Sequence, residues 1–279
     1  MSTTTLRPIT RRLRGEATSD GAGVRLTRVI GTRQIPELDP FLMLDEFGSD
    51  KPGDYIAGFP SHPHRGFETV TYMLDGRMRH KDNHGNEGLM MPGSVQWMTA
   101  GRGIVHSEMP EQEEGLMRGF QLWVNLPAKD KMGQPRYQEF SAGHIPEVTP
   151  SAGVAVKVIA GRAGGVAGPV QQPATDPLYL DIRLDAGANF EQAIASVHNA
   201  FAYVYEGEVA VGAELVGKGE LAVLGAGDGI AFTGKAARSR LILVAGKPIG
   251  EPVARYGPFV MNTQAEIMQA VQDFQAGRF

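Results

Sequence analysis

The chain has 279 residues, which is enough for one large domain or two of ordinary size. Lys and Arg number 27 against 31 Asp and Glu, a net charge of −4 that argues against direct binding of nucleic acid, and no apolar run approaches the roughly 18 residues of a membrane-spanning helix. The chain contains no cysteine, which excludes disulfides, thiolate nucleophiles, zinc–thiolate sites and iron–sulfur clusters, so any metal must be held by His, Asp or Glu.

The first residues are rich in Arg, Ser and Thr and carry no acidic side chain before Glu16. A transit peptide has this composition, but the stretch is short and residues 24–28 already alternate like a first strand. We therefore expect residues 1–22 to form a solvated N-terminal arm. A secretory hydrophobic segment is not recognisable, so the cytoplasm is the expected location.

Residues 55–125 break into short β-prone runs that Gly, Pro and Asp separate. The clearest runs are Phe67–Leu74, Val95–Met98 and Phe120–Val124, and helical periodicity of useful length is missing between them. A polar, Pro-punctuated connector follows at residues 127–150. The pattern predicts a first β-domain over residues 23–150.

The second half repeats the first. Val70–Gly76 resembles Ala200–Glu208, and Met91–Gly101 resembles Gly225–Gly234 at a similar spacing. Duplication of a small β-barrel explains both matches more economically than a chance similarity of glycine turns and strands. We therefore predict an all-β chain with a second barrel over residues 151–279.

The chain is predicted to end in a short helix. Asn262 and Thr263 can cap it and Glu266 lies in its first turn. Its apolar face would consist of Ile267, Ala270, Val271 and Phe274.

Two pairs of metal-binding residue types stand out, His62 with His64 and His106 with Glu108. On an extended strand, residues i and i+2 point to the same face, so each pair can direct two ligands into one cavity. Three neutral imidazoles and one carboxylate suit iron(II), and also manganese, nickel, copper or zinc. A six-coordinate metal would keep two positions open for water, a substrate oxygen or dioxygen.

Glu68 is a second candidate for the carboxylate ligand, because it is an even number of residues from His64 and could also face the metal. The spacing does not choose between Glu68 and Glu108. His80 and His84 lie in a polar segment and are expected to be loop residues near the cavity mouth, or simply solvated. The alternative that the two pairs are unrelated core or surface residues is weaker, since the chain has only seven His.

Four strings of the sequence resemble the pirin family of cupins: Asp39–Phe47, His62–Val70, Gln96–Ile104 and Gly257–Thr263. The resemblance extends from residue 24 to the C-terminus and is weaker in the second half, except at its end. It implies a bicupin, in which one chain forms two antiparallel β-barrels of the jelly-roll type. It also implies that the C-terminal segment, with its helix, packs back on the first domain.

The resemblance further implies that the metal, usually iron, lies in the N-terminal barrel and that its ligands fall on His62, His64, His106 and Glu108. Glu68 then becomes a candidate for orienting an imidazole without binding the metal. The second half carries a single His, His198, and neither of the paired motifs, in agreement with a barrel that lacks a metal site.

Some members of the family open flavonols such as quercetin with dioxygen and release carbon monoxide. The resemblance therefore implies a quercetin 2,3-dioxygenase, an oxidoreductase in which Glu108 takes the proton of the flavonol 3-hydroxyl. Arg65 and Arg102 are candidates for binding a phenolate. Seven large apolar residues are available to line the cavity, about half of which should face elsewhere because strands alternate: Phe59, Phe67, Met73, Met91, Trp97, Phe120 and Trp123.

Other members of the family are iron-dependent partners of transcription factors. The alternative function is therefore an iron-binding redox sensor or transcriptional co-regulator that acts through a regulatory protein. Sugar-phosphate isomerisation on zinc is a weaker alternative, because no phosphate-binding pattern of basic residues is present. We favour the dioxygenase: a monomer that takes a small aromatic substrate and contacts neither nucleic acid nor membrane.

Overall fold

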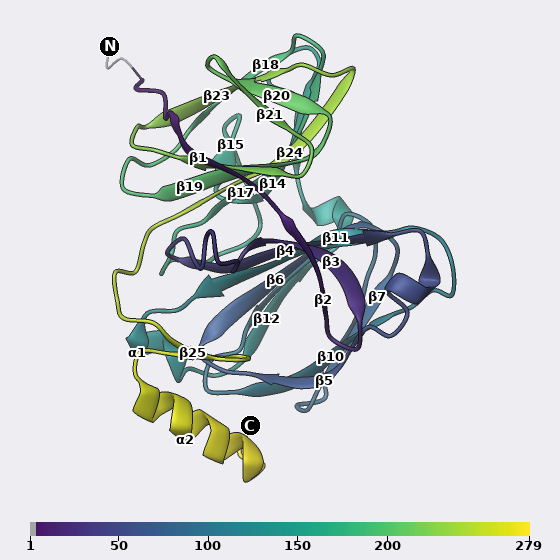
Figure 1. Ribbon diagram of the computed structural model, residues 1–279, viewed down its shortest axis with the longest axis vertical. Coiled ribbons are helices and arrows are strands. Elements are labelled where there is room, and N and C mark those ends of the chain that lie inside the picture. Colours follow the sequence, from purple (N-terminus) through teal and green to yellow (C-terminus); the bar gives the residue numbers. More distant parts are fainter. Residues whose placement is uncertain (1–3) are drawn as a thin grey trace. The chain divides into compact units, whose positions relative to one another are not determined.

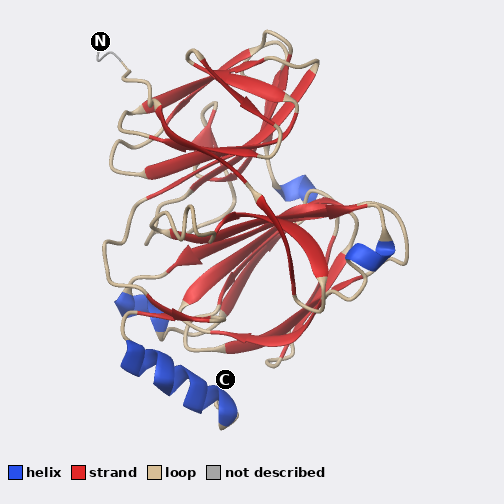
Figure 2. Ribbon diagram, viewed as in Figure 1, coloured by secondary structure: helices blue, strands red, loops and turns tan. Residues whose placement is uncertain are grey.

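The computed structural model describes residues 4–279, and strands dominate it (Figure 2). Its contacts divide the chain into two units, each built from two segments that are far apart in the sequence. The N-terminal unit comprises residues 16–142 and 249–279, and the C-terminal unit comprises residues 4–15 and 143–248. The division falls at residue 142, whereas the sequence predicts the domain boundary at 150, and residues 143–150 belong to the C-terminal unit.

The N-terminal unit contains a seven-stranded and a four-stranded antiparallel sheet (Figure 1). The larger sheet has the order β12 (Arg136–Phe140), β9 (Val95–Thr99), β6 (Phe67–Asp75), β11 (Met117–Asn125), β4 (Phe41–Ser49), β3 (Val24–Ile30), β2 (Glu16–Asp20). The smaller sheet has the order β5 (Phe59–His64), β10 (Ile104–Pro110), β7 (Met78–Asp82), β8 (Glu87–Met90). The remaining elements are the hairpin β25 (Ala254–Tyr256) and β26 (Phe259–Met261), the 3-10 turn η1 (Pro52–Asp54), and the helices α1 (Ala128–Lys131) and α2 (Gln264–Gln275).

The C-terminal unit has the same strand arrangement. Its larger sheet has the order β1 (Ile9–Arg14), β22 (Glu220–Leu224), β19 (Asn199–Glu206), β24 (Arg238–Gly246), β17 (Leu178–Asp185), β14 (Val154–Ala160), β13 (Glu147–Val148). Its smaller sheet has the order β18 (Asn189–Ala193), β23 (Gly229–Gly234), β20 (Glu208–Val211), β21 (Glu214–Gly217). A short hairpin, β15 (Arg162–Ala163) and β16 (Val166–Ala167), and the 3-10 turn η2 (Ala142–His144) complete the elements of the chain.

The shared arrangement confirms the all-β prediction, with jelly-roll sheets that stay open rather than closing into barrels. Strand β6 of the first unit and strand β19 of the second occupy equivalent places, so the match of Val70–Gly76 with Ala200–Glu208 joins equivalent strands. The second match joins strands that are not equivalent. Met91–Gly101 contains β9, whereas Gly229–Gly234 forms β23, which is the counterpart of β10. Similar glycine turns precede several strands, and one turn alone does not fix the alignment.

The interiors of the two units differ in polarity. The C-terminal unit encloses a continuous aliphatic cluster that includes Val156, Leu180 and Leu243. In the N-terminal unit, β6 carries Glu68 and Thr71 at 0% and 1% exposure, so its interior is partly polar. Buried polar groups cost free energy unless they are paired or bind a ligand, which points to the N-terminal unit as the place of a site.

The first residues differ from the predicted arm. Strand β1 pairs with β22 at the edge of the C-terminal unit's larger sheet, and β2 pairs with β3 in the N-terminal unit. Arg7 is 3% exposed and donates to the carbonyl oxygens of Gly225 and Ala195. Backbone pairing with an open sheet edge thus outweighs the charged composition. Residues 1–3 of the predicted arm lie outside the described residues.

The end of the chain folds with the N-terminal unit. Thr263 and Glu266 form a reciprocal capping box at the start of α2, as the sequence predicts, and Ile267 and Ala270 are its buried residues. The predicted connector at residues 127–150 contains α1 and the edge strand β12. No helix in residues 4–279 is long and apolar enough to cross a membrane.

Candidate metal centre

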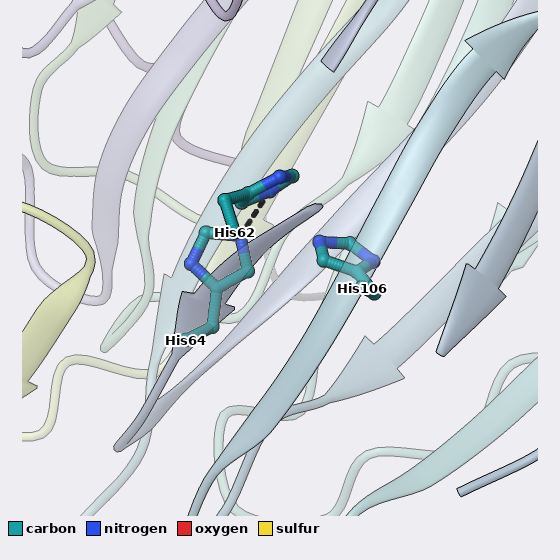
Figure 3. A group of neighbouring side chains, drawn as sticks. All are labelled: His62, His64 and His106. Atoms are coloured by element: carbon teal, nitrogen blue, oxygen red, sulfur yellow. Dashed lines mark hydrogen bonds between the residues drawn. The ribbon is translucent and has the colours of Figure 1, made fainter. Parts of the chain in front are cut away.

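Pairing of β5 with β10 brings three imidazoles together. His62 lies opposite His106 in this ladder, and His64 follows two residues later on the same face of β5. One ring nitrogen from each of His62, His64 and His106 lies within 4.8 Å of the other two. Figure 3 shows the three side chains pointing toward one another from the two strands. The i, i+2 spacing in the sequence therefore becomes a ligand cluster.

The distances in this cluster fit a shared metal ion. The Nε2 atoms of His62 and His64 are 3.0 Å apart. Two imidazoles that bind one metal at about 2.1 Å in neighbouring positions place their nitrogens about 3 Å apart. Nδ1 of His62 lies 2.8 Å from the carbonyl oxygen of Pro60, to which it donates, and this leaves Nε2 free to bind.

The burial of the cluster also fits a metal. His64 and His106 are 2% and 1% exposed, and both ring nitrogens of His106 lack a hydrogen-bond partner among the described residues. Unpartnered buried nitrogens are rare unless an ion or water satisfies them. Burial, reinforced by the neighbouring imidazoles, holds the pKa of His64 and of His106 well below the usual range. Both rings are therefore neutral at pH 7, which is the form that binds metal.

Glu108 lies beside the three imidazoles but outside the group that shares the 4.8 Å limit. A β-bulge separates the two positions, since Glu108 pairs with Phe59 and not with Pro60. Its carboxylate is buried, and accepts a hydrogen bond from Thr71 Oγ1 at 3.0 Å and a long one from Gln121 Nε2 at 3.4 Å. Burial raises the pKa of Glu108, while charge on His62 and the hydrogen bond from Thr71 lower it.

Glu68 occupies a different place. It is 0% exposed on β6 and accepts a hydrogen bond of 2.6 Å from Thr99 Oγ1. It is not part of the imidazole cluster and does not line the cavity described below. Between the two carboxylates that the spacing left open, the cavity contains Glu108.

The interpretation of His80 as a loop residue is wrong. His80 lies on β7 opposite Glu108, is 1% exposed, and its Nε2 is 2.5 Å from Glu139 Oε1. The polar segment around it forms a hairpin, and the register of that hairpin turns His80 inward. His84 lies in the turn of this hairpin and is exposed, as predicted.

A cavity of about 610 Å³ opens in front of His62, His64 and Glu108. Its size is within the range of pockets that bind small molecules. Apolar side chains form much of its wall, namely Leu26, Met43, Phe47, Phe59 and Trp123. The charged part of the wall contains Arg28, Asp45, Asp20 and Arg255.

The sequence predicted only part of this lining. Phe59 and Trp123 line the cavity, whereas Phe67, Met73, Trp97 and Phe120 are buried elsewhere in the unit and Met91 is 44% exposed. Arg65 and Arg102 do not line it either. The buried guanidinium of Arg65 is held by Asp273 at 2.7 Å and by the carbonyl oxygen of Arg102.

The cavity's two arginines were missed. Arg28 lies on β3, a strand that alternates clearly, and an inward-facing charge in such a strand is a usable signal. Arg255 comes from β25, more than a hundred residues after the other wall strands, and no local pattern marks it.

The equivalent place in the C-terminal unit carries no ligands. Strands β18 and β23 correspond to β5 and β10, and neither carries a His; their ladder includes the pair Phe190 and Phe232. His198 lies elsewhere, 3.4 Å from Asp176. Within residues 4–279, the imidazole cluster of the N-terminal unit is the group of three ligand-type residues that could hold a metal.

Two family models match the chain. The one described as Pirin matches residues 23–124, and the one described as Pirin C-terminal cupin domain matches residues 179–279. Each falls within one half of the sequence, in agreement with the duplicated strand order.

Curated relatives and solved structures agree. The chain is 55% identical over 275 residues to a pirin-like protein of Caulobacter vibrioides, covering 98% of this chain and 99% of the relative. It is 48% identical to mouse pirin over 263 residues, or 92% of this chain and 88% of the relative. A crystal structure of quercetin 2,3-dioxygenase from Acinetobacter baumannii superposes with a TM-score of 0.92 at 33% identity, and the match covers 99% of both chains.

Proposed function

The chain belongs to the pirin family of two-domain cupins, and from this premise we propose that its N-terminal unit is a metal-dependent dioxygenase that opens flavonols such as quercetin with dioxygen. The observation that carries the proposal is the cluster of His62, His64 and His106 at one end of an aromatic-lined cavity that also contains Glu108. The similarity to a structure named quercetin 2,3-dioxygenase supports the choice of substrate.

His62, His64 and His106 would hold the metal, with Glu108 as the proposed fourth ligand, and iron(II) is the metal that we propose. When bound, such a metal supplies Lewis acidity toward a substrate oxygen and redox chemistry toward dioxygen. The chain itself supplies the ligand geometry: Pro60 fixes the tautomer of His62, and the β5–β10 ladder fixes the separation of the rings.

Glu108 is the proposed general base of the reaction. It would accept the proton of the flavonol 3-hydroxyl, which the metal would acidify, because its carboxylate borders the cavity beside the imidazoles. Thr71 and Gln121 hold its two oxygens from the side of the larger sheet. These contacts orient the carboxylate without filling the cavity.

The cavity wall provides the second requirement, a dry surface for a planar aromatic molecule. Trp123 and Phe59 line it, and the lining residues Met43 and Phe47 are at most 4% exposed. Exclusion of bulk water by such a wall strengthens every polar interaction at the reacting end.

The test is dioxygen uptake by protein that has been stripped of metal and reloaded with ferrous iron, with quercetin added. We expect uptake to match the loss of flavonol in the wild type and to disappear in His62→Ala together with bound iron. His84→Ala is the matched control, since it removes an exposed histidine of the same unit. It should retain both iron and uptake.

Absence of uptake by protein that demonstrably contains iron would overturn the assignment for this substrate. Uptake that persists in an iron-free His62→Ala protein would place the chemistry outside the cluster and would overturn the proposed mechanism.

A further inference from the structure

The charged wall of the cavity contains two arginines that differ in their hydrogen-bond and ion-pair partners. Arg28 is paired: its Nε and Nη2 donate to the two oxygens of Asp45 at 2.9 and 2.8 Å, and Nη2 also donates to Asp20 at 2.8 Å. Asp45 is buried at 2% exposure, so this ion pair is a fixed part of the wall.

Arg255 has no comparable partner. Its guanidinium makes a long hydrogen bond, in which Nη1 donates to the carbonyl oxygen of Leu42 at 3.4 Å. In the described part of the chain, no carboxylate lies within ion-pair distance of its guanidinium. A guanidinium has five donors, so most of those on Arg255 remain available.

The position of Arg255 is nevertheless fixed. Its guanidinium carbon lies 4.8 Å from the centroid of the Trp123 ring, in a cation–π contact. The same Trp123 ring is packed edge-on against His64 at 5.3 Å and tilted against Phe67 at 4.3 Å. Trp123 thus links the guanidinium to the imidazole cluster along one wall of the cavity. Arg255, Trp123 and His64 all border the cavity, so a ligand bound there can contact both the guanidinium and the imidazole cluster.

The charge on Arg255 is only partly balanced. Burial, and secondarily the charge of Arg28, lower the pKa of Arg255, whereas the charges of Asp45, Glu37 and Asp20 raise it, and a bound anion would raise it further. Arg255 is exposed, so its unpaired donors are open to a ligand, and planar carboxylates and delocalised oxyanions fit the fork of a guanidinium.

We propose that Arg255, stacked on Trp123, is a substrate-binding residue that selects aromatic ligands carrying an ionised oxygen, a carboxylate or a phenolate, remote from the metal-binding end. The inference rests on the proposed function in placing the reacting end of the ligand at the imidazole cluster. It adds a charge requirement that the cluster does not impose. A neutral aromatic molecule of the same shape would lose the pairing with Arg255.

The test measures binding rather than turnover, in the absence of dioxygen. The chain has two tryptophans, so a Trp97→Phe background leaves Trp123 as the sole reporter, and a ligand bound in the cavity beside it should change its fluorescence. The carboxylate arm compares 2-naphthoate with the neutral 2-naphthamide. The phenolate arm compares quercetin with its 7-methyl ether. Arg255→Gln is measured beside Arg25→Gln, a control at an exposed arginine of the same unit that pairs with Asp54.

We expect Arg255→Gln to weaken the ionised member of at least one pair by about 10- to 100-fold and to leave the neutral member unchanged. Arg25→Gln should change neither, and Arg255→Lys should restore part of the preference because it retains the charge. An effect confined to naphthoate identifies a carboxylate as the ligand group, and an effect confined to quercetin identifies a phenolate. Thermal unfolding and metal content establish that each variant is folded and loaded.

Two results would overturn the proposal. One is wild-type protein that binds the ionised and neutral members of both pairs equally. The other is a preference that survives Arg255→Gln but disappears in His62→Ala, which would place the anion on the imidazole cluster. Failure of the dioxygenase is a separate result: anion preference without flavonol turnover would remove the reaction and retain Arg255 as the binding residue.

Discussion

The hydroxyl of Thr71 holds two side chains at the base of the cavity. Its oxygen is 3.0 Å from Glu108 Oε1 and 2.6 Å from Gln121 Oε1, yet a hydroxyl has one proton to donate. Because Gln121 Nε2 donates to Glu108 Oε2, Gln121 Oε1 faces the Thr71 hydroxyl, and the single hydroxyl proton is shared between the two acceptor oxygens. The carboxylate is then held by a hydrogen bond in a buried setting, where orientation matters most.

Thr71→Val tests this role at constant side-chain shape. We expect kcat/KM for flavonol oxidation to fall about 10- to 100-fold, because Glu108 loses the contact that orients it, while bound iron stays at the wild-type level. The measurement is steady-state kinetics with metal analysis of the same samples.

Thr99→Val is the matched control for Thr71→Val. It also removes a buried hydrogen bond from threonine to glutamate, but the acceptor is Glu68. It should lower the stability of the unit and leave kcat/KM intact. Equal losses of activity in both variants would show that the effect is a general loss of packing.

At the scale of elements, helix α2 and the residues after it are attached to the strand that carries the ligands. Val260 N donates to the carbonyl oxygen of Arg65, the residue after His64, at 3.0 Å. Gly66 adopts φ +86°, and a Cβ there would lie 2.0 Å from the oxygen of Val260, so only glycine permits this approach. Arg65 then pairs with Asp273 of α2 at 2.7 Å and lies 4.3 Å from the Phe279 ring.

Asp273→Asn tests the attachment of α2. Hydrogen bonds from Arg65 first, and then from Arg278, hold the pKa of Asp273 well below its usual range. A depressed folded-state pKa contributes stability above the unfolded value, near 3.9, and loses it as the pH falls through the folded value. We therefore expect wild type to exceed Asp273→Asn in free energy of unfolding by about 1–3 kcal/mol at neutral pH, since the Arg65 side chain is only 4% exposed.

Urea unfolding between neutral and acidic pH measures this difference. It should shrink once the pH falls below about 4. Arg278→Gln serves as the control, because its pair with Asp273 involves a side chain that is 56% exposed and is expected to cost less than about 1 kcal/mol. A difference between wild type and Asp273→Asn that stays constant down to the acid limit would contradict the ion-pair explanation.

At the scale of the whole molecule, the chain uses one strand arrangement twice with different interiors. Strands β5 and β10 carry imidazoles, and their counterparts β18 and β23 carry Phe190 and Phe232. The aliphatic cluster of the C-terminal unit fills the space that is polar in the N-terminal unit. One unit therefore has the chemistry of a site, and the other has a packed core.

This division predicts one tightly bound metal ion for each chain. Metal analysis after loading with excess iron and removal of free metal should give a ratio near one in the wild type and in His198→Ala. The ratio should fall to near zero in His106→Ala, because the second unit offers no comparable cluster. A ratio near two in the wild type, or a loss in His198→Ala, would contradict the assignment.

Local sequence patterns predicted the ligand cluster, several strands and the start of the last helix. The alternation of residues two apart predicted that His62 and His64 face one cavity with His106, because strand geometry has a fixed period of two. The capping box at Thr263 and Glu266, and the strands that begin at Phe67 and Val95, also follow from local rules. The family strings placed the chain among the two-domain cupins.

Tertiary structure decided what depends on register and on distant chain segments. His80 turns inward because β7 pairs with β10 in one register, and a shift of one residue would have turned it to solvent. Arg255 reaches the cavity because the last segment returns to the first unit and pairs beside His64, so its role depends on contacts across nearly two hundred residues. Short-range sequence patterns contain the period of a strand, but not which strand lies beside it.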